Sequence, residues 1–156
     1  MAASDQGGFQ DLVHVLGRMA DGLVQVAEEM RRVNLIHLHR LFIEQLDRAV
    51  DDPLLAAATS TLEGISEGER RQMIFANRHY GLILLAFRVG VMDRDELLGN
   101  LKILSLNVVF AEYWQRTREH RRLLPEDSLE ARVGRAVDVV MEQRFDDLEE
   151  WWVVDG

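Results

Sequence analysis

The sequence predicts an all-α fold, a single-domain bundle of six or seven helices around a central, mostly buried helix. Apolar residues recur at helical spacing over most of the chain, and no run alternates with period two as a strand would. Side chains that can cap a helix N-terminus precede several of the apolar runs. A chain of 156 residues fits one domain and can bury a core without a metal or a disulfide.

The central helix is predicted between Met73 and Val91, where the only charged residues are Arg78 and Arg88. A helix that is apolar over most of its circumference must be surrounded by other elements. A narrow stripe with Arg78, Arg88 and Ile74 is expected to reach solvent. One apolar stripe holds Met73, Ala76, Tyr80, Leu84, Phe87 and Val91, and a second holds Phe75, Leu82, Ala86 and Val89.

The N-terminal part is predicted to be a disordered segment, residues 1–8, followed by a helical domain over residues 9–145. Within it, residues 9–33 form an amphipathic helix with a heptad pattern, longer than a compact domain of this size needs. We therefore expect this helix to mediate self-association as a homodimer. A bend or a second helix is expected near Arg32–Leu35, where the apolar face shifts. The pattern residues are Leu12, Leu16, Met19, Leu23, Val26, Met30 and Val33.

Each later helix is expected to begin at a capping side chain. In chain order the caps are Asp52 followed by Pro53, Ser66 with Glu69, Asp93 with Glu96, Asn107 and Ser128. The first helices of this series should end near Thr59, Gly90 and Leu104. The helix capped by Asn107 should run from Val108 to Leu124, because Pro125 cannot continue it.

The acidic C-terminal tail, residues 146–156, contains the adjacent Trp151 and Trp152. Two interpretations stay open. In one, the last helix runs on and one tryptophan covers the edge of the core. In the other, the tail docks as a peptide, with its acids facing the basic run Arg116–Arg122 of the same or a partner subunit.

Two groups of residues are candidate binding sites. The first combines polar residues of the central helix with two aromatic residues, namely Asn77, His79, Arg88, Tyr113 and Trp114. Buried polar groups can mark a ligand pocket, but they can equally bond to neighbouring backbone while the aromatic rings anchor the core. The second group, Arg118 and Arg121 in the basic run, could bind an anion or an acidic partner. It could also reflect the preference for cations near a helix C-terminus, with Glu112 and Arg116 as a surface pair.

Composition excludes several classes of function. The absence of cysteine rules out thiolate metal sites and thiol catalysis and suits a reducing compartment. A net charge of −9 argues against nucleic acid as a partner. No signal peptide and no membrane span are expected, which predicts a cytoplasmic protein. Phosphate-binding glycine loops, nucleophile motifs and paired metal-ligand motifs are missing, so no metal, cofactor or catalytic residue is predicted.

The segments ANRHYGLILLAFRVGVMDRDELLGNL and NVVFAEYWQRTREHRRLLP resemble the actinobacterial family known as domain of unknown function 6082. The resemblance covers about Asn34 to Val140. It implies an all-α domain with no assigned activity and no catalytic residues to carry over. It also implies an apolar N-terminal anchor in many members, where this chain has a charged amphipathic helix instead.

These observations favour a non-enzymatic helical protein that mediates interaction or regulation, forms homo-oligomers and binds a protein partner not yet identified. The alternative is a small-molecule-binding protein or enzyme with a pocket between the central helix and the Tyr113–Trp114 helix.

Overall fold

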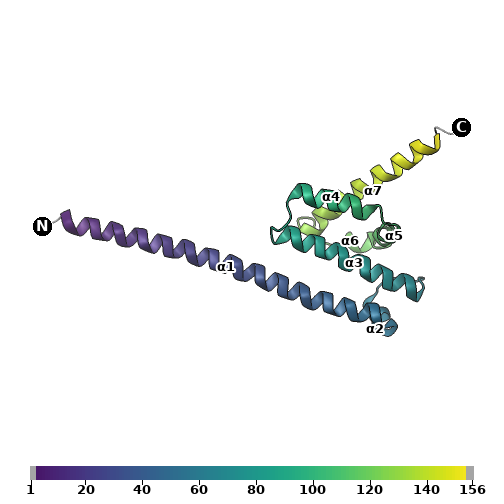
Figure 1. The fold of residues 1–156 in the computed structure, drawn as a ribbon, viewed down its shortest axis with the longest axis horizontal. Helices are drawn as coiled ribbons and strands as arrows, with labels where there is room; N and C mark the ends of the chain where they lie inside the picture. The colour runs from purple at the N-terminus through teal and green to yellow at the C-terminus, as the bar shows by residue number, and fades with distance from the viewer. Residues whose placement is uncertain (1–2, 154–156) are drawn as a thin grey trace. The chain divides into compact units, whose positions relative to one another are not determined.

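The computed structural model describes the backbone of residues 3–153 and the side chains of residues 8–143. Seven helices and no strand lie within residues 3–153 (Figure 1), which confirms the all-α fold. They are α1 (Ala3–Asp51), α2 (Pro53–Thr59), α3 (Glu67–Arg88), α4 (Arg94–Ser105), α5 (Val108–Arg116), α6 (Arg118–Arg121) and α7 (Leu129–Val153).

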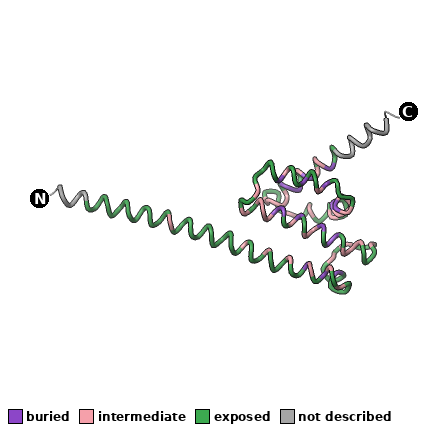
Figure 2. The backbone as a smooth tube through the Cα atoms, in the orientation of Figure 1, coloured by how far each residue is buried: buried purple, intermediate pink, exposed green. Residues whose placement is uncertain are grey.

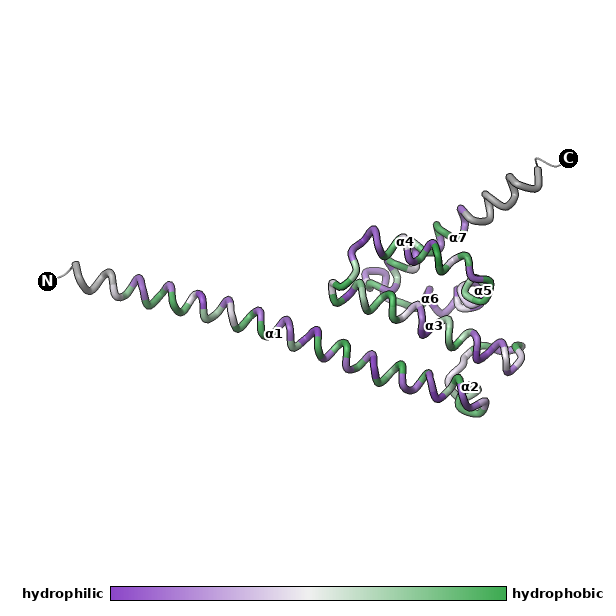
Figure 3. The backbone as a smooth tube through the Cα atoms, in the orientation of Figure 1, coloured by the Kyte–Doolittle hydropathy of each residue, from purple (hydrophilic) through white to green (hydrophobic). Residues whose placement is uncertain are grey.

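The chain divides into two compact units, Met1–Arg40 and Leu41–Gly156, where the sequence predicted one domain. The first unit is a single helix, the N-terminal part of α1. A single helix has no second element to pack against, so it cannot bury its own apolar stripe. Figure 2 colours the described residues of this unit almost entirely as exposed, and Figure 3 shows hydrophobic and hydrophilic residues interleaved along it.

Two predictions for this region are wrong. Helix α1 begins at Ala3, so the helix start expected at Phe9 lies inside it, and residues 3–8 are helical instead of disordered. The helix also continues without a bend or break through Arg32–Leu35. The apolar face can move around a helix without interrupting the backbone hydrogen bonds, and this segment has no proline or glycine to interrupt them.

The second unit has two apolar clusters, and α3 contributes to both. The larger cluster contains Ala76, Tyr80, Ile83, Leu84, Leu97, Leu101, Phe110, Trp114, Val133, Val137 and Met141, which come from α3, α4, α5 and α7. The smaller cluster joins Ile74 of α3 to Leu46 and Ala49 of α1 and Ala56 of α2. Helix α3 is therefore central, as the sequence predicted.

Burial of α3 is less complete than its composition indicated. Phe75 and Leu82, on the second predicted stripe, are 51% and 54% exposed, so other elements cover that face only in part. Ile74, assigned to the solvent stripe, is instead buried in the smaller cluster. An apolar residue of a helix is buried only where another element packs against it. Helical periodicity alone does not show which face of the helix that element will cover.

The predicted caps are confirmed. Asp52 accepts a hydrogen bond from the backbone N–H of Leu54 at 2.8 Å, with Pro53 at the first helical position. Ser66 with Glu69 and Asp93 with Glu96 form reciprocal capping boxes. Asn107 and Ser128 accept from the N–H groups three residues ahead at 3.0 and 3.1 Å. These bonds satisfy backbone donors that a helix start otherwise leaves free.

The helix expected to run from Val108 to Leu124 is divided in two. Helix α5 ends at Arg116, and the short helix α6 begins at Arg118. The hydroxyl of Thr117 donates to the Tyr113 carbonyl at 2.8 Å, and Arg121 Nη1 donates to the Trp114 carbonyl at 2.6 Å. Side chains thus donate hydrogen bonds to the backbone carbonyls in the last turn of α5. These bonds compete with continuation of the helix, so α5 ends before Pro125.

Helix α7 continues through residue 153, past the boundary predicted at residue 146. The backbone therefore runs on as in the first interpretation of the tail. The side chains of Trp151 and Trp152 and residues 154–156 lie outside the described part of the chain.

Two glycines allow a test of the packing around α7. An added Cβ at Gly134 would lie 3.8 Å from Arg121 Cδ and 3.9 Å from Trp114 Cη2, which are ordinary contact distances. We expect Gly134→Ala to raise the free energy of unfolding by about 1 kcal/mol, since alanine favours a helix over glycine by that amount. Urea unfolding measures the change.

Gly90→Ala is the contrasting control, because Gly90 has φ of 79° where it follows α3. A side chain is strained in that region, so this variant should lose about 1–2 kcal/mol. A destabilised Gly134→Ala would show that α7 packs more tightly on Trp114 than the distances indicate.

Candidate functional site

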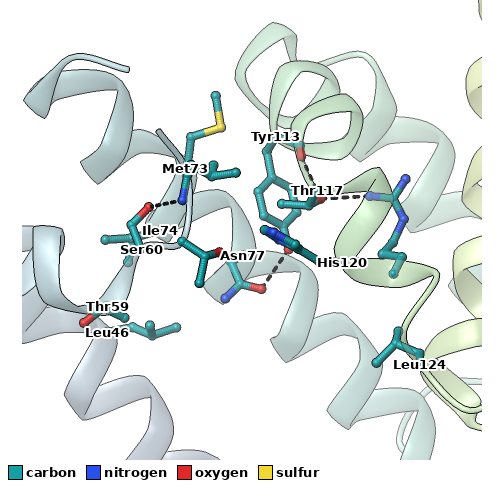
Figure 4. A pocket seen from close by; sticks show the side chains of 13 residues that line it. Leu46, Thr59, Ser60, Met73, Ile74, Asn77, Tyr113, Thr117, His120 and Leu124 are labelled. Carbon is teal, nitrogen blue, oxygen red and sulfur yellow. Dashed lines mark hydrogen bonds between the residues drawn. The ribbon is translucent and has the colours of Figure 1, made fainter. Parts of the chain in front are cut away.

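A cavity of about 280 Å³ lies among the smaller cluster, α3, α5 and α6 of the second unit. Its lining residues are Leu46, Thr59, Ser60, Thr61, Leu62, Met73, Ile74, Asn77, Tyr113, Thr117, His120, Arg121 and Leu124. Figure 4 shows their side chains converging from four parts of the chain. Asn77 of α3 faces Tyr113 of α5 across this cavity.

The hydrogen bond between Tyr113 and Asn77 joins the two walls of this cavity. Tyr113 Oη donates to Asn77 Oδ1 at 2.9 Å (Figure 4), across 36 residues of sequence. Burial raises the pKa of the Tyr113 phenol to about 12, and Arg121 opposes that rise. The phenol therefore stays neutral at physiological pH and serves as a hydrogen-bond donor.

Arg121 is held inside the unit instead of facing solvent. Its guanidinium lies over the Trp114 ring, 3.6 Å from the centroid, and Nη1 donates to Thr117 Oγ1 at 2.8 Å. Its Nη2 lies 3.3 Å from Asp138 Oδ1, which also accepts the Trp114 indole N–H at 2.7 Å. Burial lowers the pKa of Arg121, and the Asp138 carboxylate opposes that shift. The result is a guanidinium held in a fixed position at one wall of the cavity, with its charge paired to Asp138.

Tyr80 lies behind this wall in the core. Its ring packs edge-on against Trp114 at 5.2 Å and is tilted against Phe110 at 6.0 Å. The buried hydroxyl has no hydrogen-bond partner among the described residues. Burial raises the pKa of Tyr80 well above its ordinary value.

The five residues predicted to share a pocket do not share one. Asn77 and Tyr113 line the cavity, and Trp114 packs directly beneath Arg121. His79 is exposed and borders a different hollow, because two helical positions correspond to a rotation of about 200°. Arg88 lies about 16 Å from Asn77 along the axis of α3, at 1.5 Å per residue. There it forms an ion pair with Glu130 of α7.

The basic run is mostly paired with nearby acids. Arg116 contacts Glu112 at 2.8 Å, as the sequence predicted, and Arg122 contacts Glu119 at 2.7 Å. Arg121 is committed to Trp114 and Asp138, as described above. Arg118 is exposed and has no ion-pair partner among the residues with described side chains. The run is thus not one continuous cationic surface.

Sequence reasoning missed several residues of the cavity and its wall. Ser60, Thr117 and His120 contribute polar atoms to the lining, and Asp138 anchors both Trp114 and Arg121. Thr117 could have been found, because it lies one helical turn after Tyr113. No local signal identifies Ser60, which precedes α3 in a loop. Within the described residues, no group of three or more potential ligands could hold a metal ion.

The predicted self-association residues form a second candidate site, in the first unit. They are Leu12, Leu16, Met19, Leu23, Val26 and Met30, and each is more than half exposed. A hollow between Gly22, Val26, Met30 and Val33 lies on the same stripe. The described helices include none that is long and apolar enough to cross a membrane.

The two tyrosines provide a matched test of the site geometry. Tyr113→Phe removes the donor to Asn77, so it should cost about 1 kcal/mol of unfolding free energy. Tyr80→Phe removes a buried hydroxyl that has no partner in the described structure, so it should be neutral or slightly stabilising. Urea titration of both variants measures the difference. Equal losses would contradict the Tyr113–Asn77 bond as the distinguishing contact.

Stability should also fall in alkali. In the folded protein the pKa of Tyr113 is about 12, against an ordinary value of 10 in the unfolded chain. Between these values the unfolded chain has released a proton that the folded chain still binds, so unfolding becomes easier as pH rises. Urea midpoints from about pH 9 to pH 11 should decline, and less steeply for the Tyr80→Phe, Tyr113→Phe double variant. Parallel slopes would mean that neither phenol is buried as described.

Comparison with known proteins identifies a family but no activity. The family described as Family of unknown function (DUF6082) matches residues 11–150, which include both candidate sites. No curated protein and no solved structure matches the chain. Because the family match spans most of the 156 residues, the chain belongs to this family of unknown function.

Proposed function

We propose that this protein is a non-enzymatic helical interaction or regulatory protein that self-associates through residues 9–33 of α1. One observation carries the proposal. A helix that forms a unit without any core presents seven large apolar residues at regular heptad spacing, from Leu12 to Val33. An apolar surface of this kind on a water-soluble helix is typical of an interaction site.

The heptad pattern supports a second copy of the same chain as the occupant. In the heptad register, Leu16, Leu23 and Met30 take the a positions, and Leu12, Met19, Val26 and Val33 take the d positions. A seam with apolar a and d residues is complementary to another such seam. Every copy of this chain carries the same seam, so self-association requires no other partner.

The distribution of charge agrees with this register. Between Phe9 and Val33, the only charged residue beside the seam is Glu29, which pairs with Arg32 at 2.6 Å on the same helix. The e positions carry Val13, Ala20 and Ala27, which widen the apolar face. The other charged residues lie away from the seam and are Asp11, Arg18, Asp21, Glu28, Arg31 and Arg32.

The seam also has a defined end. The next a and d positions hold His37 and Arg40, and the first unit ends at Arg40. Polar residues at a and d positions lower the stability of a coiled coil. We therefore confine the proposed interface to the first unit, which leaves the second unit available to bind a protein partner. We also propose a cytoplasmic location, since a reducing compartment suits a chain without cysteine.

Two seam substitutions test the proposal. Leu16→Asp with Leu23→Asp replaces two a-position side chains, each of which contributes about 1.5–3 kcal/mol when buried. Light scattering after size exclusion, at tens of micromolar protein, should show an oligomer for the wild type. The double variant should be a monomer, with its dissociation constant raised at least about 100-fold.

The matched control adds the same charge to the same helix away from the seam. Gln10 and Gln25 occupy b and c positions, so Gln10→Asp with Gln25→Asp should leave the oligomer intact. Urea unfolding of each variant checks that the second unit keeps its stability. A monomeric wild type at tens of micromolar, or equal dissociation by both double variants, would contradict self-association through this seam.

A further inference from the structure

The lining of the second unit's cavity is asymmetric in charge. Of its thirteen residues, none is acidic, while His120 and Arg121 are basic. This contrasts with a chain whose net charge is −9. Asp138, the acid that pairs with Arg121, does not belong to the lining. A partly open hollow whose lining has basic side chains and no acidic one favours a negatively charged occupant.

The amide of Asn77 is oriented by Tyr113. Because the phenol donates to Oδ1 at 2.9 Å, the amino group of Asn77 must point away from that bond. This group makes no hydrogen bond to the described residues, although each amide nitrogen has two N–H donors. A half-buried donor without a partner can bind an acceptor atom of a ligand.

The remaining part of the lining is apolar. Leu46, Met73 and Ile74 form one side, and Leu62 and Leu124 contribute further apolar surface. At about 280 Å³ the cavity is at the small end of the range for ligand pockets. Its occupant should therefore combine one acceptor group with a short apolar chain.

We propose that this cavity binds a small monocarboxylate with a short aliphatic chain. The carboxylate accepts hydrogen bonds from Asn77 Nδ2 and the His120 imidazole, on the side of the hollow where the Arg121 guanidinium lies. The aliphatic chain lies against Leu46, Met73 and Ile74. Every residue of this site belongs to the second unit, so the proposal does not depend on self-association through the first.

Hexanoate and its neutral isostere hexanamide test the ligand class on the full-length protein. Titrations followed by calorimetry and by the side-chain amide resonance of Asn77 should show saturable binding of hexanoate. Hexanamide should bind at least about tenfold more weakly, because charge-assisted hydrogen bonds are about twice as strong as neutral ones. Equal affinities for the two probes would overturn the proposal. So would the absence of binding at a probe concentration of about 10 mM, which is ten times a dissociation constant of about 1 mM.

Variants distinguish this site from weak binding elsewhere. Asn77→Asp keeps an oxygen acceptor for Tyr113 but places a negative charge in the lining, so it should abolish hexanoate binding. His120→Gln, at an exposed position, should weaken hexanoate binding severalfold without affecting folding. Arg122→Gln is the matched control, since Arg122 lies two residues from His120 and outside the lining. Unchanged hexanoate affinity in a folded Asn77→Asp or His120→Gln variant, or an equal loss in Arg122→Gln, would overturn the assignment.

Discussion

Burial of the Trp114 indole constrains the whole second unit. This side chain is 3% exposed, and its N–H group must find an acceptor in the core because an unpaired buried donor is costly. Asp138 of α7 supplies that acceptor at 2.7 Å. The carboxylate then needs a compensating charge, which Arg121 of α6 provides while it covers the face of the indole. One aromatic residue of α5 thus links α6 to α7.

The cavity is a consequence of the same contacts. Because Arg121 turns inward to the Trp114 carbonyl and Thr117, α5 ends at Arg116 and the chain starts a new short helix. That change of direction places His120 at the edge of the space beside Asn77 and Tyr113. A continuous helix would have carried His120 along the axis of α5. The polar wall and the break between α5 and α6 therefore have one physical cause.

The two units differ in how far their apolar residues are buried. In the second unit, α3 contributes to two clusters, where residues of α1, α2, α4, α5 and α7 remove part of its apolar surface from water. In the first unit, a comparable number of large apolar residues lies on one helix with no other element of that unit to cover them. Regular heptad spacing turns that stripe into a surface suited to a second identical helix. Folding of the second unit is consequently separable from the self-association that we propose for the first.

The sequence by itself determined the local features of this protein. The caps at Asp52, Ser66, Asp93, Asn107 and Ser128 depend on side chains within three residues, and the heptad spacing of the first unit is a property of one helix. Tertiary structure decided which stripes are covered: Ile74 is buried by α1 and α2, whereas Phe75, its neighbour in sequence, is left exposed. It also decided that Asn77 meets Tyr113 and that Arg121 turns inward to Asp138. These contacts join residues 36 and 17 positions apart, and helical periodicity carries no information about which faces of distant helices will meet.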